Sequence, residues 1–199
     1  MPARALRAEL RLALSLWALP GPVRRFYCRA RRRALRASDA FSLDSAARPR
    51  ELAALLRLAH GHETVVELGT GTAWTAIALA LDDDRRTVIS YDPHVRPQRD
   101  AYLQLAGGRA GERIDLREET DSAGPHPDDA PVEVLFIDSS HECQPTVAAF
   151  GAWREALAAR AVVVFHDYGH PSYPGVREAV EHLGLIGEEL GGAFVWRAP

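Results

Sequence analysis

Two short segments each place a carboxylate next to an imidazole: Asp138 stands three residues before His141, and His166 is followed directly by Asp167. Each pair comes directly after a run of apolar residues, which is typical of a strand buried on both faces of a sheet. Because the carboxyl ends of parallel strands meet at one edge, these four side chains are expected to share a site. Carboxylates with an imidazole can hold a divalent cation, and an imidazole can act as a base near neutral pH.

Structural roles are the alternative for the same residues. Asp138 and the two serines after it could cap the following helix, and His166 could be a buried histidine whose hydrogen bonds are satisfied. A repeat of the same residue types at two neighbouring strand ends favours a shared ligand over two unrelated caps.

A glycine turn lies earlier in the chain, where Gly69-Thr70-Gly71 leads from an apolar run into a helical segment. Gly69 and Gly71 allow a tight turn and the close approach of a bulky cofactor to a helix N-terminus. A dinucleotide fingerprint requires a third glycine where this chain has Trp74, and it has no use for the acid at Glu67. The combination disfavours NAD and favours S-adenosylmethionine, whose zwitterionic methionine end tolerates a nearby carboxylate.

Two further acids follow the next strands. Asp92 can accept hydrogen bonds from both ribose hydroxyls of a nucleoside, and its distance from the glycine turn is similar to the roughly 20-residue spacing of nucleotide-binding folds. Asp121 could accept a hydrogen bond from an adenine amino group. Asp92, taken alone, could equally be a turn former.

The elements that must position these residues alternate between strand and helix, which predicts an α/β fold with a parallel sheet and crossover helices. The expected strands are 64–68, 87–91, 113–117, 132–137 and 161–165, and the expected helices are 51–59, 73–81, 98–106, 146–158 and 175–183. The tail, residues 185–197, is expected to form a hairpin that turns on two glycines.

The N-terminal segment, residues 1–38, carries ten arginines against one glutamate, although the whole chain has a net charge of −3. On a helical wheel Arg4, Arg7, Arg11 and Ser15 share a narrow face, so most of the helix circumference must be buried. Packing on its own domain or on another subunit is favoured, because a charge run is more often a solvated face than a site. Contact with a membrane surface is the alternative, while the acidic remainder of the chain argues against nucleic acid. We predict a helical extension, residues 1–38, and a catalytic domain, residues 39–199.

The composition of the 199 residues, 47% hydrophobic with two cysteines, excludes collagen-like, disordered and disulfide-scaffold proteins. The apolar stretch 12–19 is shorter than the roughly 20 residues that span a bilayer, and it lacks the features of a signal peptide. We therefore expect a cytoplasmic protein with two reduced thiols.

Taken together, these motifs resemble those of the class I S-adenosylmethionine-dependent methyltransferases, over about residues 45–183. The D-x-x-H and H-D strand ends resemble a bacterial subgroup similar to the metal-dependent O-methyltransferases. The resemblance implies a Rossmann-like, mostly parallel sheet of seven strands with helices on both faces. The tail hairpin would supply the last two strands, one of them antiparallel.

The resemblance also implies roles for individual residues. The cofactor would contact Glu67, Gly69, Thr70, Gly71, Asp92, Asp121 and Asp138. Asp138 and Asp167 would hold Mg²⁺ or another divalent cation, and His141 would be the general base, with His166 as the alternative base or a third ligand. The implied reaction is methylation of a hydroxyl on a small-molecule acceptor, by a chain that could form a homo-oligomer. An NAD-dependent oxidoreductase and a non-catalytic cofactor-binding partner remain the alternatives.

Overall fold

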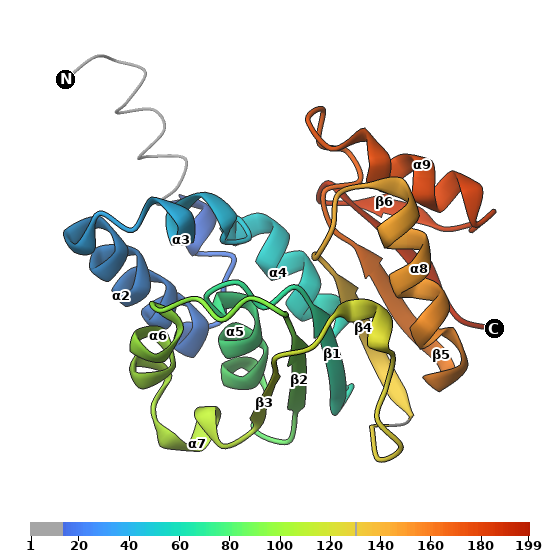
Figure 1. The fold of residues 1–199 in the computed structure, drawn as a ribbon. Coiled ribbons are helices and arrows are strands. Elements are labelled where there is room, and N and C mark those ends of the chain that lie inside the picture. Colours follow the sequence, from blue (N-terminus) through green and yellow to red (C-terminus); the bar gives the residue numbers. More distant parts are fainter. Residues whose placement is uncertain (1–13, 130) are drawn as a thin grey trace.

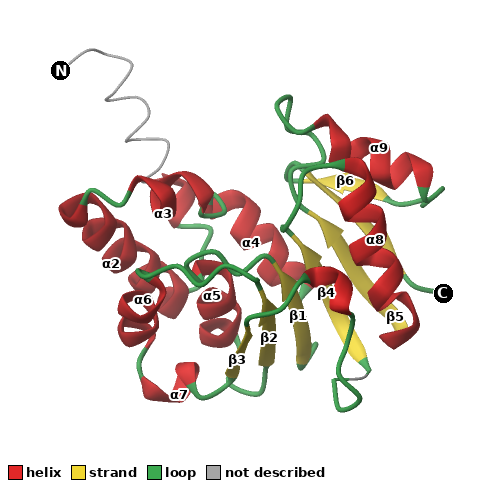
Figure 2. Ribbon diagram, viewed as in Figure 1, coloured by secondary structure: helices red, strands yellow, loops and turns green. Residues whose placement is uncertain are grey.

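The computed structural model describes residues 14–129 and 131–199, which form a seven-stranded sheet in the order β3-β2-β1-β4-β5-β7-β6 (Figures 1 and 2). Strands β1 to β5 are parallel, whereas β7 is antiparallel to both β5 and β6. The predicted α/β fold with a seven-stranded, mostly parallel sheet is therefore confirmed. The strands are β1 (Thr64–Leu68), β2 (Thr87–Tyr91), β3 (Ile114–Arg117), β4 (Val132–Ile137), β5 (Leu157–Phe165), β6 (Glu188–Leu190) and β7 (Ala193–Arg197).

Helices cover both faces of the sheet because successive strand residues point to opposite sides. Val134 and Phe136 of β4 pack into one apolar core, while Leu135 and Ile137 pack into the other. The first core is closed by α2 (Gly21–Ala37), α4 (Pro49–Leu58), α5 (Trp74–Asp82), α6 (Arg99–Ala106) and α7 (Gly108–Gly111). The second core is closed by α8 (Cys143–Trp153) and α9 (Pro174–His182).

Helix α2 packs its apolar side against the domain. Phe26 and Tyr27 are buried, and their rings meet Trp74 edge-on at centroid distances of 6.2 and 5.4 Å. The helix ends where Ser38 adopts a left-handed conformation, and the short helix α3 (Ala40–Ser45) follows. The three arginines predicted to share a face upstream, at positions 4, 7 and 11, lie outside the described residues. The division into an extension and a domain remains a prediction.

The predicted helix 146–158 is wrong at its C-terminal end. Helix α8 ends at Trp153, a 3-10 turn spans Arg154–Ala156, and β5 begins at Leu157. The segment after Leu157 is rich in alanine and has a high helix propensity, but Leu157 pairs with Val132 of β4. Arg160 adopts a positive φ of 63°, and the pairing with β4 shifts register between Val132 and Val134. Tertiary pairing therefore overrides local preference here.

The sheet brings the ends of four strands level with one another. Leu68 pairs with both Tyr91 and Ile137, and Ile137 pairs with Phe165. The residues after these strands therefore emerge at the same edge of the sheet. No helix in the described ranges combines the length and the apolar character needed to cross a bilayer.

Candidate active site

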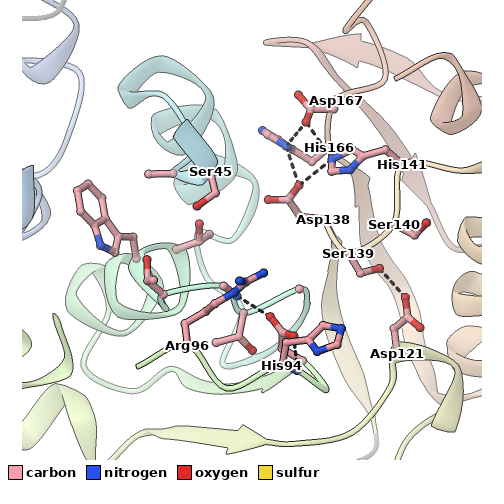
Figure 3. Close-up of a pocket in the computed structure, with 18 of the residues that line it drawn as sticks. Ser45, His94, Arg96, Asp121, Asp138, Ser139, Ser140, His141, His166 and Asp167 are labelled. Carbon is pink, nitrogen blue, oxygen red and sulfur yellow. Dashed lines mark hydrogen bonds and ion pairs between the residues drawn. The ribbon is translucent and has the colours of Figure 1, made fainter. Parts of the chain in front are cut away.

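A cavity of about 580 Å³ opens at this carboxyl edge, between the strand ends and the segment of α3 and α4 that passes over them (Figure 3). Nearly all of the site residues predicted from the sequence line it: Gly69, Thr70, Gly71, Asp92, Asp121, Asp138, His141, His166 and Asp167. The fold thus gathers residues that are up to about 100 positions apart in the chain.

The glycine turn forms the floor of the cavity. Gly69 has a φ of +103°, and a Cβ atom there would collide with the main-chain carbonyl of Asp138. The N–H of Gly71 donates a hydrogen bond to Asp92 Oδ2 at 2.8 Å, and the N–H of His94 donates to Oδ1 at 2.8 Å. The carboxylate of Asp92 is therefore held at the cavity wall, and its remaining lone pairs can accept hydrogen bonds from a ligand.

Glu67 is the exception among the predicted residues, since it does not belong to the described lining of the cavity. Its side chain is 1% exposed and accepts a hydrogen bond from Ser90, whose hydroxyl lies 2.7 Å from that of Thr70. Burial raises the pKa of Glu67 to about 8, and the negative charges of Asp138 and Asp92 act in the same direction against the Ser90 hydrogen bond. Glu67 therefore reaches the cavity only through Ser90 and Thr70.

Asp121 begins the 3-10 turn Asp121–Ala123 and borders the cavity beside Ser139. The Ser139 hydroxyl donates a hydrogen bond to the Asp121 carboxylate, and the indole N–H of Trp153 donates to the Asp121 carbonyl at 2.7 Å. These bonds fix a polar end of the cavity that the sequence located only approximately.

The two Asp/His pairs form one cluster at the ends of β4 and β5 (Figure 3). His141 Nε2 lies 3.1 Å from Asp167 Oδ2 and 3.8 Å from Asp138 Oδ1. His166 Nδ1 lies 2.9 Å from Asp138 Oδ1 and 3.4 Å from Asp167 Oδ2. The two histidines therefore share the same two carboxylates, and their hydrogen bonds hold the pKa of Asp167 well below its usual range despite its partial burial.

His166 is enclosed by acids on both sides of its ring. Its Nε2 lies 3.6 Å from Glu51 Oε2 of α4, opposite the nitrogen that faces Asp138. Burial alone would lower the pKa of His166, but the charge of Asp138 and hydrogen bonds to Asp138, Asp167 and Glu51 raise it to about 12. A histidine that stays protonated cannot accept a proton, so the arrangement does not favour His166 as the base.

His141 is more open than His166, with 30% of its side chain exposed against 11%. Its ring stacks on Tyr173 at a centroid distance of 4.0 Å, and Tyr173 stacks on His170 at 4.6 Å. With the Nε2–H donated to Asp167, the second ring nitrogen is left as a proton acceptor. Of the two histidines, His141 therefore fits the role of a base.

A divalent cation also has candidate ligands here. Asp138, His141 and Asp167 each offer one ligand atom, and these atoms lie within 4.8 Å of one another. Carboxylate oxygens with an imidazole suit Mg²⁺ or Mn²⁺. The donor set fits a cation, although each of its carboxylates already interacts with both histidines.

Several residues of the site carried no signal in the sequence. Glu51 was expected only as part of a helix, and Phe41, Arg96 and Tyr173 come from segments without a recognisable motif. The available signal is Pro49, the first residue of α4, because proline is favoured at the first position of a helix and so indicates a helix N-terminus near Glu51. The fold, and not the local sequence, brings these side chains to the cavity.

Comparisons with known proteins agree with this architecture. A family model described as a methyltransferase domain matches residues 66–168, more than half of the chain. No curated protein matches the chain at the level of sequence.

Solved structures show the same fold at low sequence identity. Cofactor-bound Rv0187 from MTB aligns with a TM-score of 0.64 at 20% identity, over 82% of this chain and 88% of that one. The O-methyltransferase TomG from Streptomyces achromogenes, in complex with S-adenosylmethionine, aligns with a TM-score of 0.59 at 16% identity, over 77% of this chain and 82% of that one. CalS11, a TDP-rhamnose 3′-O-methyltransferase of calicheamicin biosynthesis, aligns with a TM-score of 0.56 at 18% identity, over 73% of this chain and 76% of that one.

The matched family covers the glycine turn, Asp92, and both Asp/His pairs. A dehydrogenase is thereby set aside, in agreement with the missing third glycine at Trp74. The chain belongs to the methyltransferase domain family and is a class I S-adenosylmethionine-dependent methyltransferase.

Proposed function

We propose that the protein methylates a hydroxyl group of a small-molecule acceptor, with His141 as the general base. The observation that carries this proposal is the His141–Asp167 pair, 3.1 Å apart and open to the cavity. Asp167 accepts the Nε2–H and so holds the imidazole in the tautomer whose other nitrogen is basic. The ring nitrogen that does not face Asp167 can then take the proton of an acceptor hydroxyl.

The cofactor residues keep the roles expected from the sequence, apart from Glu67. Asp92 accepts hydrogen bonds from the ribose, Asp121 faces the adenine, and Asp138 contacts the cofactor. Gly69, Thr70 and Gly71 permit close approach of the backbone. Bound S-adenosylmethionine supplies an electrophilic methyl group on a sulfonium sulfur.

The chemical step is an in-line displacement, which requires the acceptor oxygen to be aligned with the methyl carbon. The oxygen–carbon bond forms as the carbon–sulfur bond breaks, and the hydroxyl proton passes to His141. The products are a methyl ether and S-adenosylhomocysteine. Proton removal by a positioned base typically contributes 10²–10⁴-fold to the rate.

A metal-assisted form of the reaction is the second candidate, because three ligand atoms converge within 4.8 Å. Asp138, His141 and Asp167 would hold the cation, which would lower the pKa of the acceptor hydroxyl. In that arrangement His141 would be a ligand of the cation and not the base, and a chelator would abolish turnover.

The test is transfer of labelled methyl groups to a panel of phenols and hydroxy acids. We expect His141→Ala to lower turnover at least 100-fold and to change affinity for S-adenosylhomocysteine less than twofold. His182→Ala, an exposed histidine at the end of α9, is the matched control and should change neither. Full activity of His141→Ala would refute the assignment of the base, and loss of activity in a chelator would favour the metal-assisted form.

A further inference from the structure

Arg96 is a charged side chain at the cavity that has no hydrogen-bond or ion-pair partner among the described residues. It follows β2 in the loop after Asp92 and lines the cavity. Its side chain makes no hydrogen bond or ion pair with any residue in the described ranges, and its Nε is buried without a partner. The guanidinium instead lies over the ring of Phe41, 4.0 Å from the centroid. An unpaired guanidinium in a cavity indicates an anionic ligand group, because a buried donor without an acceptor is costly.

The position of Arg96 indicates which end of the ligand it meets. Phe41 lies 3.7 Å from where a Cβ atom on Gly71 would stand, so Arg96, Phe41 and the glycine turn are neighbours. In Figure 3, Arg96 and Ser45 lie on one side of the cavity, whereas Asp121 and Ser139 lie on the other. With the adenine beside Asp121, the opposite side receives the methionine end.

The same end of the cavity offers main-chain donors. Helix α5 begins at Trp74, and its N-terminus has no side-chain cap. Trp74 and Thr75, its first two residues, both line the cavity. The free N–H groups and the positive end of the helix dipole favour a negative group there.

The other charged groups of the lining are less suited to a carboxylate. Arg48 is exposed, and its main-chain N–H donates a hydrogen bond to Glu51 Oε2 at 2.9 Å. His166 is already surrounded by Asp138, Asp167 and Glu51. Of the two arginines in the described lining, Arg96 is therefore the better placed, since its Nε is buried at the cavity whereas Arg48 is exposed.

We infer that Arg96 binds the carboxylate of the methionine end of S-adenosylmethionine, with the N-terminus of α5 beside it. This inference rests on the proposed position of the cofactor in the cavity. Arg96 thereby selects ligands that carry the amino-acid end, in addition to the recognition of the nucleoside by Asp92.

The test is calorimetric titration of the full chain with S-adenosylhomocysteine and with 5′-methylthioadenosine, which lacks the amino-acid end. Arg96→Gln should lower the affinity for S-adenosylhomocysteine more than tenfold and change the affinity for 5′-methylthioadenosine less than twofold. Arg96→Lys, which keeps the charge, should recover part of the loss. The matched control is Arg177→Gln, because Arg177 also lies over an aromatic ring, that of Tyr168 at 4.6 Å, but outside the cavity lining.

Two results would overturn the inference. Unchanged affinity of Arg96→Gln for S-adenosylhomocysteine would assign the guanidinium to the acceptor. An equal loss of affinity for both ligands would show that Arg96 is a structural residue of the loop. Failure of the wild-type chain to bind S-adenosylhomocysteine is a separate outcome, and it would refute the cofactor site itself.

Discussion

Replacing Glu67 by glutamine should make the protein more stable at alkaline pH, and the reason lies in the burial of this carboxyl group. Glu67 is 1% exposed, and burial raises its pKa from 4.5 to about 8. Below pH 4.5 the group is protonated in both the folded and the unfolded chain. As the pH rises toward 8 the unfolded chain releases the proton first, so the folded state loses stability over this range.

The size of the effect follows from the shift of the pKa. Each unit corresponds to about 1.4 kcal/mol, so the shift from 4.5 to about 8 sets an upper limit of about 5 kcal/mol. The side chain of glutamine has the shape of the protonated carboxyl group and can still accept the hydrogen bond from Ser90. The difference in the free energy of unfolding between Glu67→Gln and the wild type should therefore grow by about 2–4 kcal/mol, in favour of the variant, as the pH rises from 5 to 8.

Urea unfolding at pH 5, 6, 7 and 8, followed by circular dichroism, measures this difference directly. Glu178→Gln, an exposed glutamate on α9, is the control and should give a curve parallel to that of the wild type. Parallel curves for Glu67→Gln would show that Glu67 is ionised in the folded protein, and would refute the reasoning. The same variant should bind S-adenosylhomocysteine within about threefold of the wild type, because Glu67 lies behind Thr70.

Three further substitutions test the packing and the cofactor site. Trp74→Ala removes the ring contacts to Phe26, Tyr27 and Tyr102 and should cost about 3–5 kcal/mol in urea unfolding; a loss below about 1 kcal/mol would contradict the anchoring of α2. Ala73→Gly relieves a φ of +66° and should raise the free energy of unfolding by up to about 1 kcal/mol, whereas a decrease would mean that the residue is not strained. Asp92→Ala should lower the affinity for S-adenosylhomocysteine more than tenfold in calorimetry, because it removes the proposed acceptor for the ribose hydroxyls. Unchanged affinity would place the ribose elsewhere.

The sequence predicted best what depends on continuous apolar runs. The bounds of β1, β2 and β4 agree with the prediction because each run is long enough to be buried on both faces. Once these strands are parallel and in register, the positions of Asp92, Asp138 and His166 follow, since each comes directly after a strand. The positions of the site residues at the strand ends therefore follow from the parallel, in-register sheet.

The remainder of the site depends on contacts that no local pattern reveals. Glu51 faces His166 across more than 100 residues of chain, and this contact adds to those of Asp138 and Asp167, which raise the pKa of His166. Arg96 and Phe41 meet across the glycine turn although neither belongs to a motif. The polarity of a residue can be read from the sequence, but its partners are set by the tertiary packing.

The most direct test of this account is the calorimetric titration of the full chain with S-adenosylhomocysteine and with NAD, each with and without magnesium. We predict that S-adenosylhomocysteine binds at one site per chain with an affinity that does not depend on magnesium, and that NAD does not bind. Tight binding of NAD, or no binding of S-adenosylhomocysteine under any of these conditions, would contradict the assignment of the cavity to S-adenosylmethionine.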